Sequence, residues 1–356
     1  MKLLNDLTIV VPSFNRQSYL LRLLKYWSGK GPKVLAFDGS PTPIGQTAIS
    51  GLSSNIKYFH QPNSLYERLR TAVGLVSSKY VMLATDDEFY IPSALHACIN
   101  ELENDNELVS CGGRAISFGF DNCVWGESVY EKLANLNLSE LERSDRVYKH
   151  FSNYVPAHLY AVSHSSKWVP IARQIFSDEY DFFAAWELQF EFMLPYVGKT
   201  RILDNLLWLR SCEAEPIRDT SPSMSENITI NNWWRQDVFL RQKEEFLYRM
   251  GKLSEDLGLK FSDFTPDFTA AISIYIHNNY DYHENRILTL RGKLRKYLFS
   301  FIPPRLKKIF KKVIHSFRFR TREKLPDALE RMKGVGVIVD LNEVAEVEYL
   351  IRQHHA

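Results

Sequence analysis

Short apolar strands alternate with amphipathic helices along the first hundred residues, and this alternation restricts the possible fold more than any other feature. The expected strands are 7–11, 33–37, 56–59 and 80–84. Apolar residues recur at helical spacing between them, over 20–27 and 65–76. Parallel strands need crossover connections, so this order predicts a mostly parallel α/β sheet with helices on its faces.

Polar residues follow three of these strands, at 13–16, 38–40 and 85–87. Ligands of open parallel sheets bind beyond the carboxyl ends of the strands. The sequence therefore predicts a binding site where these three polar segments meet.

The segment 80–87 is the most informative of the three, because an apolar strand leads directly into Asp86 and Asp87. Adjacent carboxylates can hold Mg²⁺ or Mn²⁺, which prefer hard oxygen ligands. A surface turn in which Asp87 caps the next segment explains the same pattern. The residues alone leave both interpretations open.

The three strand ends together resemble the inverting family-2 glycosyltransferases of the GT-A fold. That family has strands ending in PxYN, DDGS and DxDD, and this chain reads LTIVVPSFNR, KVLAFDGS and KYVMLATDDEFYIPSAL in the same order. The resemblance covers residues 7 to about 100 and extends more loosely over 155–215. It implies a GT-A type, Rossmann-like sheet with flanking helices, followed here by a helical C-terminal region.

The resemblance also implies roles for individual residues. The nucleotide pocket would be lined by Pro12, Ser13 and Phe14. Asp38 would face the base, and Asp86 and Asp87 would lie by the ribose and a divalent cation, Mn²⁺ or Mg²⁺. A nucleoside diphosphate gains negative charge as it leaves, and a cation offsets that charge.

Two positions depart from the family pattern. Ala84 stands where the first Asp of DxDD is usual, and Phe37 replaces the first acid of DDGS. Because Ala84 removes one possible ligand, we expect Asp87 to be the main metal ligand.

Three arginines are candidates for contacts with the reactants: Arg68 and Arg70 with the diphosphate or base, and Arg210 with the diphosphate or acceptor. Arg68 and Arg70 belong to the expected helix 65–76, where a solvated helix face explains them equally well. Arg210 belongs to 206–211, a segment that resembles the apolar family segment that closes the site.

Inverting transfer needs a base that accepts the proton of the acceptor hydroxyl. The family supplies it from a Glu-Asp pair, but aligning 186–188 with the family's WEL places Ala184 and Ala185 at that pair. Glu187 lies on the apolar stripe of an expected helix over 179–194, where desolvation would raise its pKa, so it is our first candidate. A salt bridge to a core-facing arginine such as Arg210 is the alternative explanation for Glu187.

Asp181 is the second candidate for the base. It would be the third residue of the expected helix, with Asp178 as the N-cap, and an acid there satisfies free backbone N–H groups. Asp181 therefore also has a purely structural explanation.

The net charge of +2 conceals an uneven distribution of charge. Of 44 Lys and Arg and 42 Asp and Glu, residues 286–324 hold 14 bases and one acid, net +13, which leaves net −11 elsewhere. Apolar residues within 306–317 recur at three- and four-residue spacing, while most lysines lie off that stripe. This pattern favours a cationic amphipathic helix on an anionic membrane surface.

A helix packed on the catalytic domain, with its lysines in solvent, is an alternative interpretation of the same segment. Nucleic-acid binding is disfavoured because no recognised module accompanies the charge.

We predict four regions along the chain. They are a glycosyltransferase domain over 1–220 with a nucleotide-sugar half (1–109) and an acceptor half (110–220), a helical extension (221–285), the basic membrane-surface segment (286–324) and a C-terminal tail (325–356). The four cysteines form no CxxC pair, and no apolar run approaches the ~18 residues of a membrane span, so we expect a cytoplasmic protein at the inner face of the membrane.

The resemblance implies transfer of a sugar from a nucleotide-sugar donor to a saccharide or lipid-linked acceptor, with inversion, in bacterial surface polysaccharide synthesis. The alternative is a binding or scaffold protein of the same fold that has lost catalysis, which the alanines at 84, 184 and 185 keep open.

Overall fold

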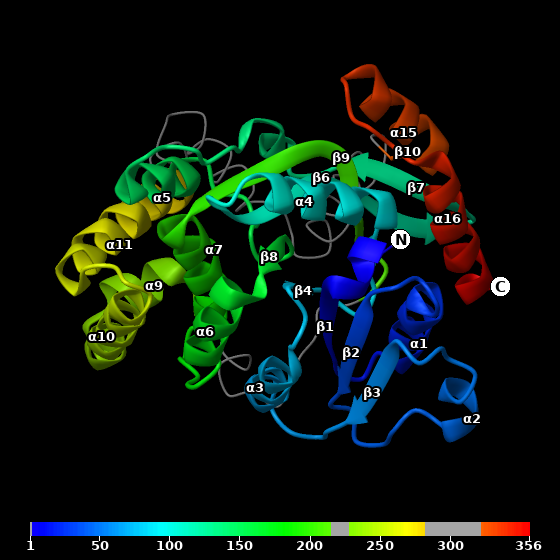
Figure 1. The fold of residues 1–356 in the computed structure, drawn as a ribbon, viewed down its shortest axis with the longest axis horizontal. Helices are drawn as coiled ribbons and strands as arrows, with labels where there is room; N and C mark the ends of the chain where they lie inside the picture. Colours follow the sequence, from blue (N-terminus) through cyan, green and yellow to red (C-terminus); the bar gives the residue numbers. More distant parts are fainter. Residues whose placement is uncertain (1, 215–227, 282–321) are drawn as a thin grey trace, which may run out of the picture.

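The computed structural model describes residues 2–214, 228–281 and 322–356 (Figure 1). The basic segment predicted over 286–324 therefore lies outside the described residues, except for 322–324.

A ten-stranded sheet in the order β10-β7-β6-β8-β4-β1-β2-β3 crosses the molecule, with β9 paired to both β6 and β5. The strands are β1 (Leu7–Ser13), β2 (Lys33–Asp38), β3 (Ile56–His60), β4 (Tyr80–Leu83), β5 (Phe89–Tyr90), β6 (Leu108–Asp121), β7 (Cys123–Ser128), β8 (Val162–His164), β9 (Lys199–Ser211) and β10 (Glu323–Lys324). Strands β1 to β4 pair in parallel, as do β6 and β9. The short strand β8 lies between β4 and β6 and pairs antiparallel with both, and β5, β7 and β10 also pair antiparallel with their neighbours. This arrangement confirms the predicted mostly parallel α/β sheet.

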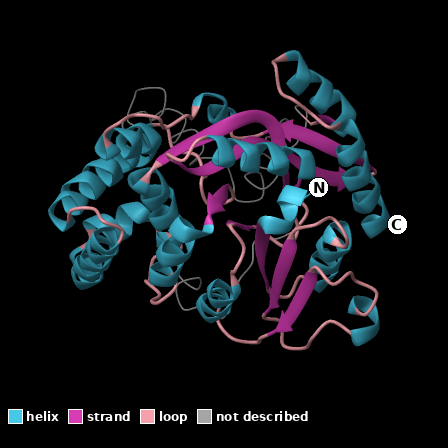
Figure 2. Ribbon diagram, in the orientation of Figure 1, coloured by secondary structure: helices cyan, strands magenta, loops and turns pink. Residues whose placement is uncertain are grey.

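Helices cover both faces of the sheet. They are α1 (Gln17–Trp27), α2 (Gln46–Ile49), α3 (Leu65–Leu75), α4 (Pro92–Asn104), α5 (Arg143–Ser152), α6 (Ser165–Ile175), α7 (Ala185–Val197), α9 (Ile230–Arg235), α10 (Leu240–Asp256), α11 (Phe261–Ile276), α15 (Leu325–Gly334) and α16 (Leu341–His355). The described part of the chain also contains the short helical turns η1 (Lys2–Asp6), η2 (Glu131–Asn135), η3 (Asp237–Phe239) and the π-turn η4 (His277–Asp281). Figure 2 shows α5, α7 and α9–α11 at one end of the molecule and α15 and α16 at the other.

Two hydrophobic cores lie on opposite faces of the sheet. Side chains alternate along a strand, so Ile9 and Val11 enter one core while Val10 enters the other. Helices α1, α4, α15 and α16 close the first core, and α3, α5, α6, α7, α10 and α11 close the second. Burial on both faces explains why β1 reads as a continuous apolar run in the sequence.

The helix expected over 179–194 begins only at Ala185, which corrects that prediction. Asp178 is therefore not a helix N-cap, and Asp181 is not a third helical residue. Both side chains are bound by α10 instead: Asp178 pairs with Arg249, and the Asp181 carboxylate accepts a hydrogen bond from Gln242. These contacts with a distant helix favour an irregular segment before α7.

The C-terminal tail is part of the main body. β10 pairs with β7, and α16 buries Val344, Val347 and Ile351 in the first core. Between α15 and α16, the residues 335–339 form a single bridge to the sheet, between Ile338 and Asn205. Within the described residues, no helix has the length and apolar character needed to cross a membrane.

Candidate active site

A cleft of about 520 Å³ opens beyond the carboxyl ends of β1 and β4, where the sequence predicts a binding site. Its walls come from those strand ends, α3, the start of α7 and the end of β9. Among the predicted site residues, those lining it are Pro12, Ser13, Phe14, Arg68, Asp87, Glu187 and Arg210. The fold thus brings together residues separated by almost two hundred positions.

Four predicted site residues do not line the cleft. Asp38 and Asp86 are fully buried near its floor, at the ends of β2 and β4. Arg70 donates to the backbone carbonyls of Phe176 and Ser177, at 3.1 and 3.0 Å, and so holds the end of α6. Asp181 is exposed and bound to Gln242. We therefore leave Arg70 and Asp181 out of the candidate site.

The two acids that follow β4 share one cation. Arg16 Nη1 lies 3.3 Å from Asp86 Oδ1 and 3.3 Å from Asp87 Oδ2. Ser13 Oγ donates to the other Asp86 oxygen at 2.7 Å. Burial, with the neighbouring charge of Asp87, raises the pKa of Asp86 to about 7, and the contacts from Ser13 and Arg16 oppose that rise.

Arg16 is a site residue that the sequence reasoning missed. It directly follows the polar end of β1, the signal that could have identified it.

A divalent cation fits Asp87 better than Asp86. Both Asp86 oxygens already accept hydrogen bonds, whereas the Asp87 carboxylate borders the cleft and offers hard oxygen ligands. Arg16 beside Asp87 shows that this corner of the cleft accommodates positive charge.

Gly39 allows Arg68 to reach the cleft. A Cβ at residue 39 would collide with the Arg68 guanidinium, so any other residue there would displace this buried side chain from its present position. The guanidinium lies 5.9 Å from the centroid of the Phe14 ring and donates to the backbone carbonyl of Asn63. Asp38, before this glycine, accepts hydrogen bonds from Gln17 and Tyr58, both at 2.7 Å.

Glu187 lies in the first turn of α7 and borders the cleft. Tyr154 Oη donates to its Oε1 at 2.7 Å. Burial raises the pKa of Glu187 to about 7; Tyr154 opposes that rise and the charge of Glu191 adds to it. Glu187 forms no ion pair with any described residue, so the alternative salt bridge to Arg210 is absent; Arg210 lies 5.8 Å from the Tyr130 ring centroid instead.

Glu88 is another buried acid that lines the cleft, and the sequence reasoning missed it. Trp208 Nε1 donates to it at 2.6 Å, and burial, followed by the charge of Asp87, raises the pKa of Glu88 to about 8. An acid directly after Asp86 and Asp87 was the available signal. The missed cleft residues also include the aromatic side chains Tyr160, Phe183 and Trp186.

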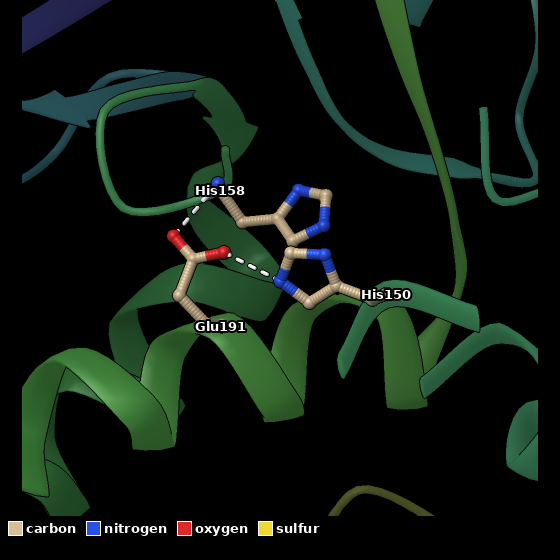
Figure 3. Close-up of side chains that lie close together, drawn as sticks. All are labelled: His150, His158 and Glu191. Carbon is tan, nitrogen blue, oxygen red and sulfur yellow. Dashed lines mark hydrogen bonds and ion pairs between the residues drawn. The ribbon is translucent and has the colours of Figure 1, made fainter. Parts of the chain in front are cut away.

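A separate group of potential metal ligands lies one helical turn further along α7. His150, His158 and Glu191 are fully buried, and one ligand atom from each lies within 4.8 Å of the others (Figure 3). The Glu191 oxygens, however, already accept four N–H groups, from His150 Nε2 (2.8 Å) and the backbone of Ala157 (3.2 Å), His158 (2.9 Å) and Leu159 (2.8 Å). A metal ion would have to displace these donors, so we interpret the group as structural.

Comparison with known proteins agrees with this description. Residues 8–158 match the model of the family described as glycosyl transferase family 2, which confirms the resemblance over that part of the chain and supports a sugar transferase. No curated protein matches the sequence.

Solved structures of low sequence identity resemble this chain. TarS 1–349 of S. aureus in complex with UDP-GlcNAc has 12% identity and a TM-score of 0.50, and the match covers 82% of this chain and 76% of that chain. TarS 1–349 in complex with UDP has 12% identity and a TM-score of 0.44, covering 80% and 92%. The first likeness supports the predicted GT-A type α/β fold.

Proposed function

We propose that this protein is an inverting glycosyltransferase that moves a sugar from a nucleoside-diphosphate donor to a saccharide or lipid-linked acceptor. One observation carries the proposal: Asp87 and Glu187, from different walls, line one cleft at the carboxyl edge of the sheet. The family match over residues 8–158 supports the reaction class.

In the proposed mechanism, the nucleotide lies against Pro12, Ser13 and Phe14, with Asp38 and Asp86 shaping the floor of its pocket. Arg16, Arg68 and Arg210 supply positive charge that offsets the charge on the departing diphosphate. A divalent cation, when bound, would add Lewis-acid stabilisation of the diphosphate, and Asp87 would be its main protein ligand, with Asp86 behind it.

Glu187 accepts the proton of the acceptor hydroxyl. The oxygen of that hydroxyl attacks the anomeric carbon of the donor sugar, and the nucleoside diphosphate leaves. A pKa of about 7 suits this role, because a general base works best when its pKa lies near the operating pH. A single displacement of this kind inverts the configuration at the anomeric carbon.

UDP-GlcNAc is the first donor to test, because a structure with a similar fold contains it. The acceptor surface would include the rings of Phe183 and Trp186. We place the reaction on the cytoplasmic face of a membrane, held there by the basic segment 286–324, in the assembly of a bacterial surface polysaccharide. We also propose that the catalytic domain ends near residue 220, the helical extension near 285 and the basic segment near 324.

Isothermal titration calorimetry with UDP-GlcNAc, UDP, GDP-mannose and GDP, each with and without Mn²⁺, tests the proposal. We expect binding of at least one nucleotide, strengthened by Mn²⁺. We expect Asp87→Asn to weaken it about tenfold or more, since one charged ligand to the cation is lost. Asp256→Asn, an exposed acid at the end of α10, is the matched control and should bind like wild type.

Two results would count against the proposal. Absence of binding to every nucleotide in both conditions would favour a scaffold that keeps the fold without the activity. Unchanged binding and full transfer in Asp87→Asn would remove Asp87 from the mechanism.

A further inference from the structure

Helix α7 carries two acids one turn apart, Glu187 at the cleft and Glu191 in the interior. Residues four apart lie on the same helical face. Both acids contact the chain between α5 and β8, so this connection is attached to α7 at two points.

Glu191 makes the deeper attachment. Its oxygens accept N–H groups from three successive residues, 157–159, and from His150 at the end of α5. Figure 3 shows the contacts from His150 and from the backbone of His158. Burial lowers the pKa of His150 to about 3, so the imidazole is neutral and donates through Nε2. Burial raises the pKa of Glu191, and the three backbone N–H groups are among the contacts that oppose this rise. Four donors on two oxygens suit an ionised carboxylate, because they offset part of the cost of burying its charge.

Tyr154 makes the second attachment. Its hydroxyl donates to Glu187 at 2.7 Å, and its ring is fixed by edge-to-face packing on Tyr275 of α11, with centroids 4.8 Å apart. The ring also lies 5.5 Å from that of His150, so both attachments share one packed group. Further along the same connection between α5 and β8, Tyr160 lines the cleft.

We propose that Tyr154 is a positioning residue that holds the Glu187 carboxylate at the wall of the cleft, and that the Glu191 attachment keeps Tyr154 in place. This inference rests on the proposed role of Glu187 as the base. It adds a residue outside the cleft lining on which that base depends.

The environment of Glu187 gives the expected direction of the effect. Burial and the charge of Glu191 raise its pKa, and the Tyr154 hydroxyl is the contact that opposes them. The other titratable groups near it are the phenols of Tyr130, Tyr160 and Tyr275, which lie close enough for its charge to raise their pKa values. Arg210 borders the same cleft. Removing the Tyr154 hydroxyl should therefore raise the pKa of Glu187 further.

The test is a direct titration of Glu187 by NMR in protein labelled with ¹³C-glutamate, with the signal assigned by its loss in Glu187→Gln. In Tyr154→Phe we expect the midpoint to rise by about one pH unit, since a hydrogen bond to an ionised group is lost. Tyr275→Phe removes a hydroxyl from the same aromatic cluster and should leave the midpoint unchanged. Because Tyr154→Phe keeps the ring and its packing, the variant should fold.

UDP release from a donor that binds provides a second measurement. Turnover of Tyr154→Phe should fall about tenfold near pH 6 and approach that of wild type above about pH 8.5, where Glu187 is ionised in both. A merely structural defect would lower activity equally at every pH.

The two proposals can fail separately. Identical titration of Glu187 in wild type and Tyr154→Phe would overturn the inference, whatever the enzyme does. Full transfer by Glu187→Gln would instead overturn the role of Glu187 in the proposed function, even if the titration shifted as expected.

Discussion

Three carboxyl groups at the cleft have pKa values raised by burial: Asp86 and Glu187 to about 7 and Glu88 to about 8. Each retains a hydrogen-bond donor, from Ser13, Tyr154 and Trp208 respectively. Such groups change protonation near neutral pH, which is unusual for acids and typical of functional sites. The burial and the hydrogen-bond donor of each carboxyl group, more than its being Asp or Glu, therefore determine its protonation.

Glu187→Gln should lower kcat by about 10²- to 10⁴-fold and leave the KM for donor nearly unchanged. Glutamine keeps the shape and accepts the Tyr154 hydrogen bond, but cannot take up the proton. Steady-state kinetics on the donor identified by calorimetry measures both constants.

Asp181→Asn is the matched control, because Asp181 is the other acid that the sequence favours and the structure places it against α10. The assignment would be reversed if Asp181→Asn abolished transfer and Glu187→Gln did not.

Helices and strands agree with the sequence-based prediction where the residues within the element are enough to specify it. The apolar runs at β1 and β4 form strands, and Ser64 and Glu67 form a capping box that starts α3. The start of α7 was missed because Asp178 and Asp181, in the segment before it, form polar contacts with α10, more than sixty positions further along the chain. Local propensity cannot include contacts of that kind.

At the C-terminus, Ile351→Ala should lower the free energy of unfolding by about 2–5 kcal/mol, because the side chain is fully buried and its loss leaves a cavity. Chemical denaturation measures this change.

Leu341→Ala on the same helix, α16, is the control. Leu341 is 46% exposed, so the cost should stay below about 0.5 kcal/mol. Equal costs for the two variants would contradict the packing of α16 against the body.

On the scale of the whole molecule, the sheet brings predicted site residues from distant parts of the chain to one cleft. The loops after β1 and β4 bring Arg16 and Asp87 to one corner, and α7 and β9 bring Glu187 and Arg210 to the same cleft. The tail closes the opposite side of the sheet and reaches the loop beside the cleft, where His355 contacts Glu213 at 2.6 Å. Glu213 also pairs with the buried Arg22, which donates to the Asp87 carbonyl.

The uneven charge of the whole chain predicts association with anionic membranes. Replacing Lys307, Lys308, Lys311 and Lys312 by Gln should weaken sedimentation with phosphatidylserine-containing vesicles at least about tenfold, since each base contributes ~1 kcal/mol at such a surface. Donor binding should not change.

The control replaces Lys57, Lys132, Lys252 and Lys333, four exposed lysines elsewhere, by Gln. This variant has the same net charge and should sediment like wild type. Equal loss in both variants would mean that total charge, and not the segment, determines binding.

By itself the sequence predicted the first four strands, the edge of the sheet at which the cleft opens and seven of the residues that line that cleft. It could do so because strand periodicity and polar strand ends are local properties, and parallel pairing carries them to a common edge. Only the tertiary structure favoured Glu187 over Asp181 as the candidate base. It also excluded Arg70 from the candidate site, added Arg16 and Glu88 to it, and placed the tail on the sheet. Those outcomes depend on burial and on partners far away in the chain, and both are set by packing.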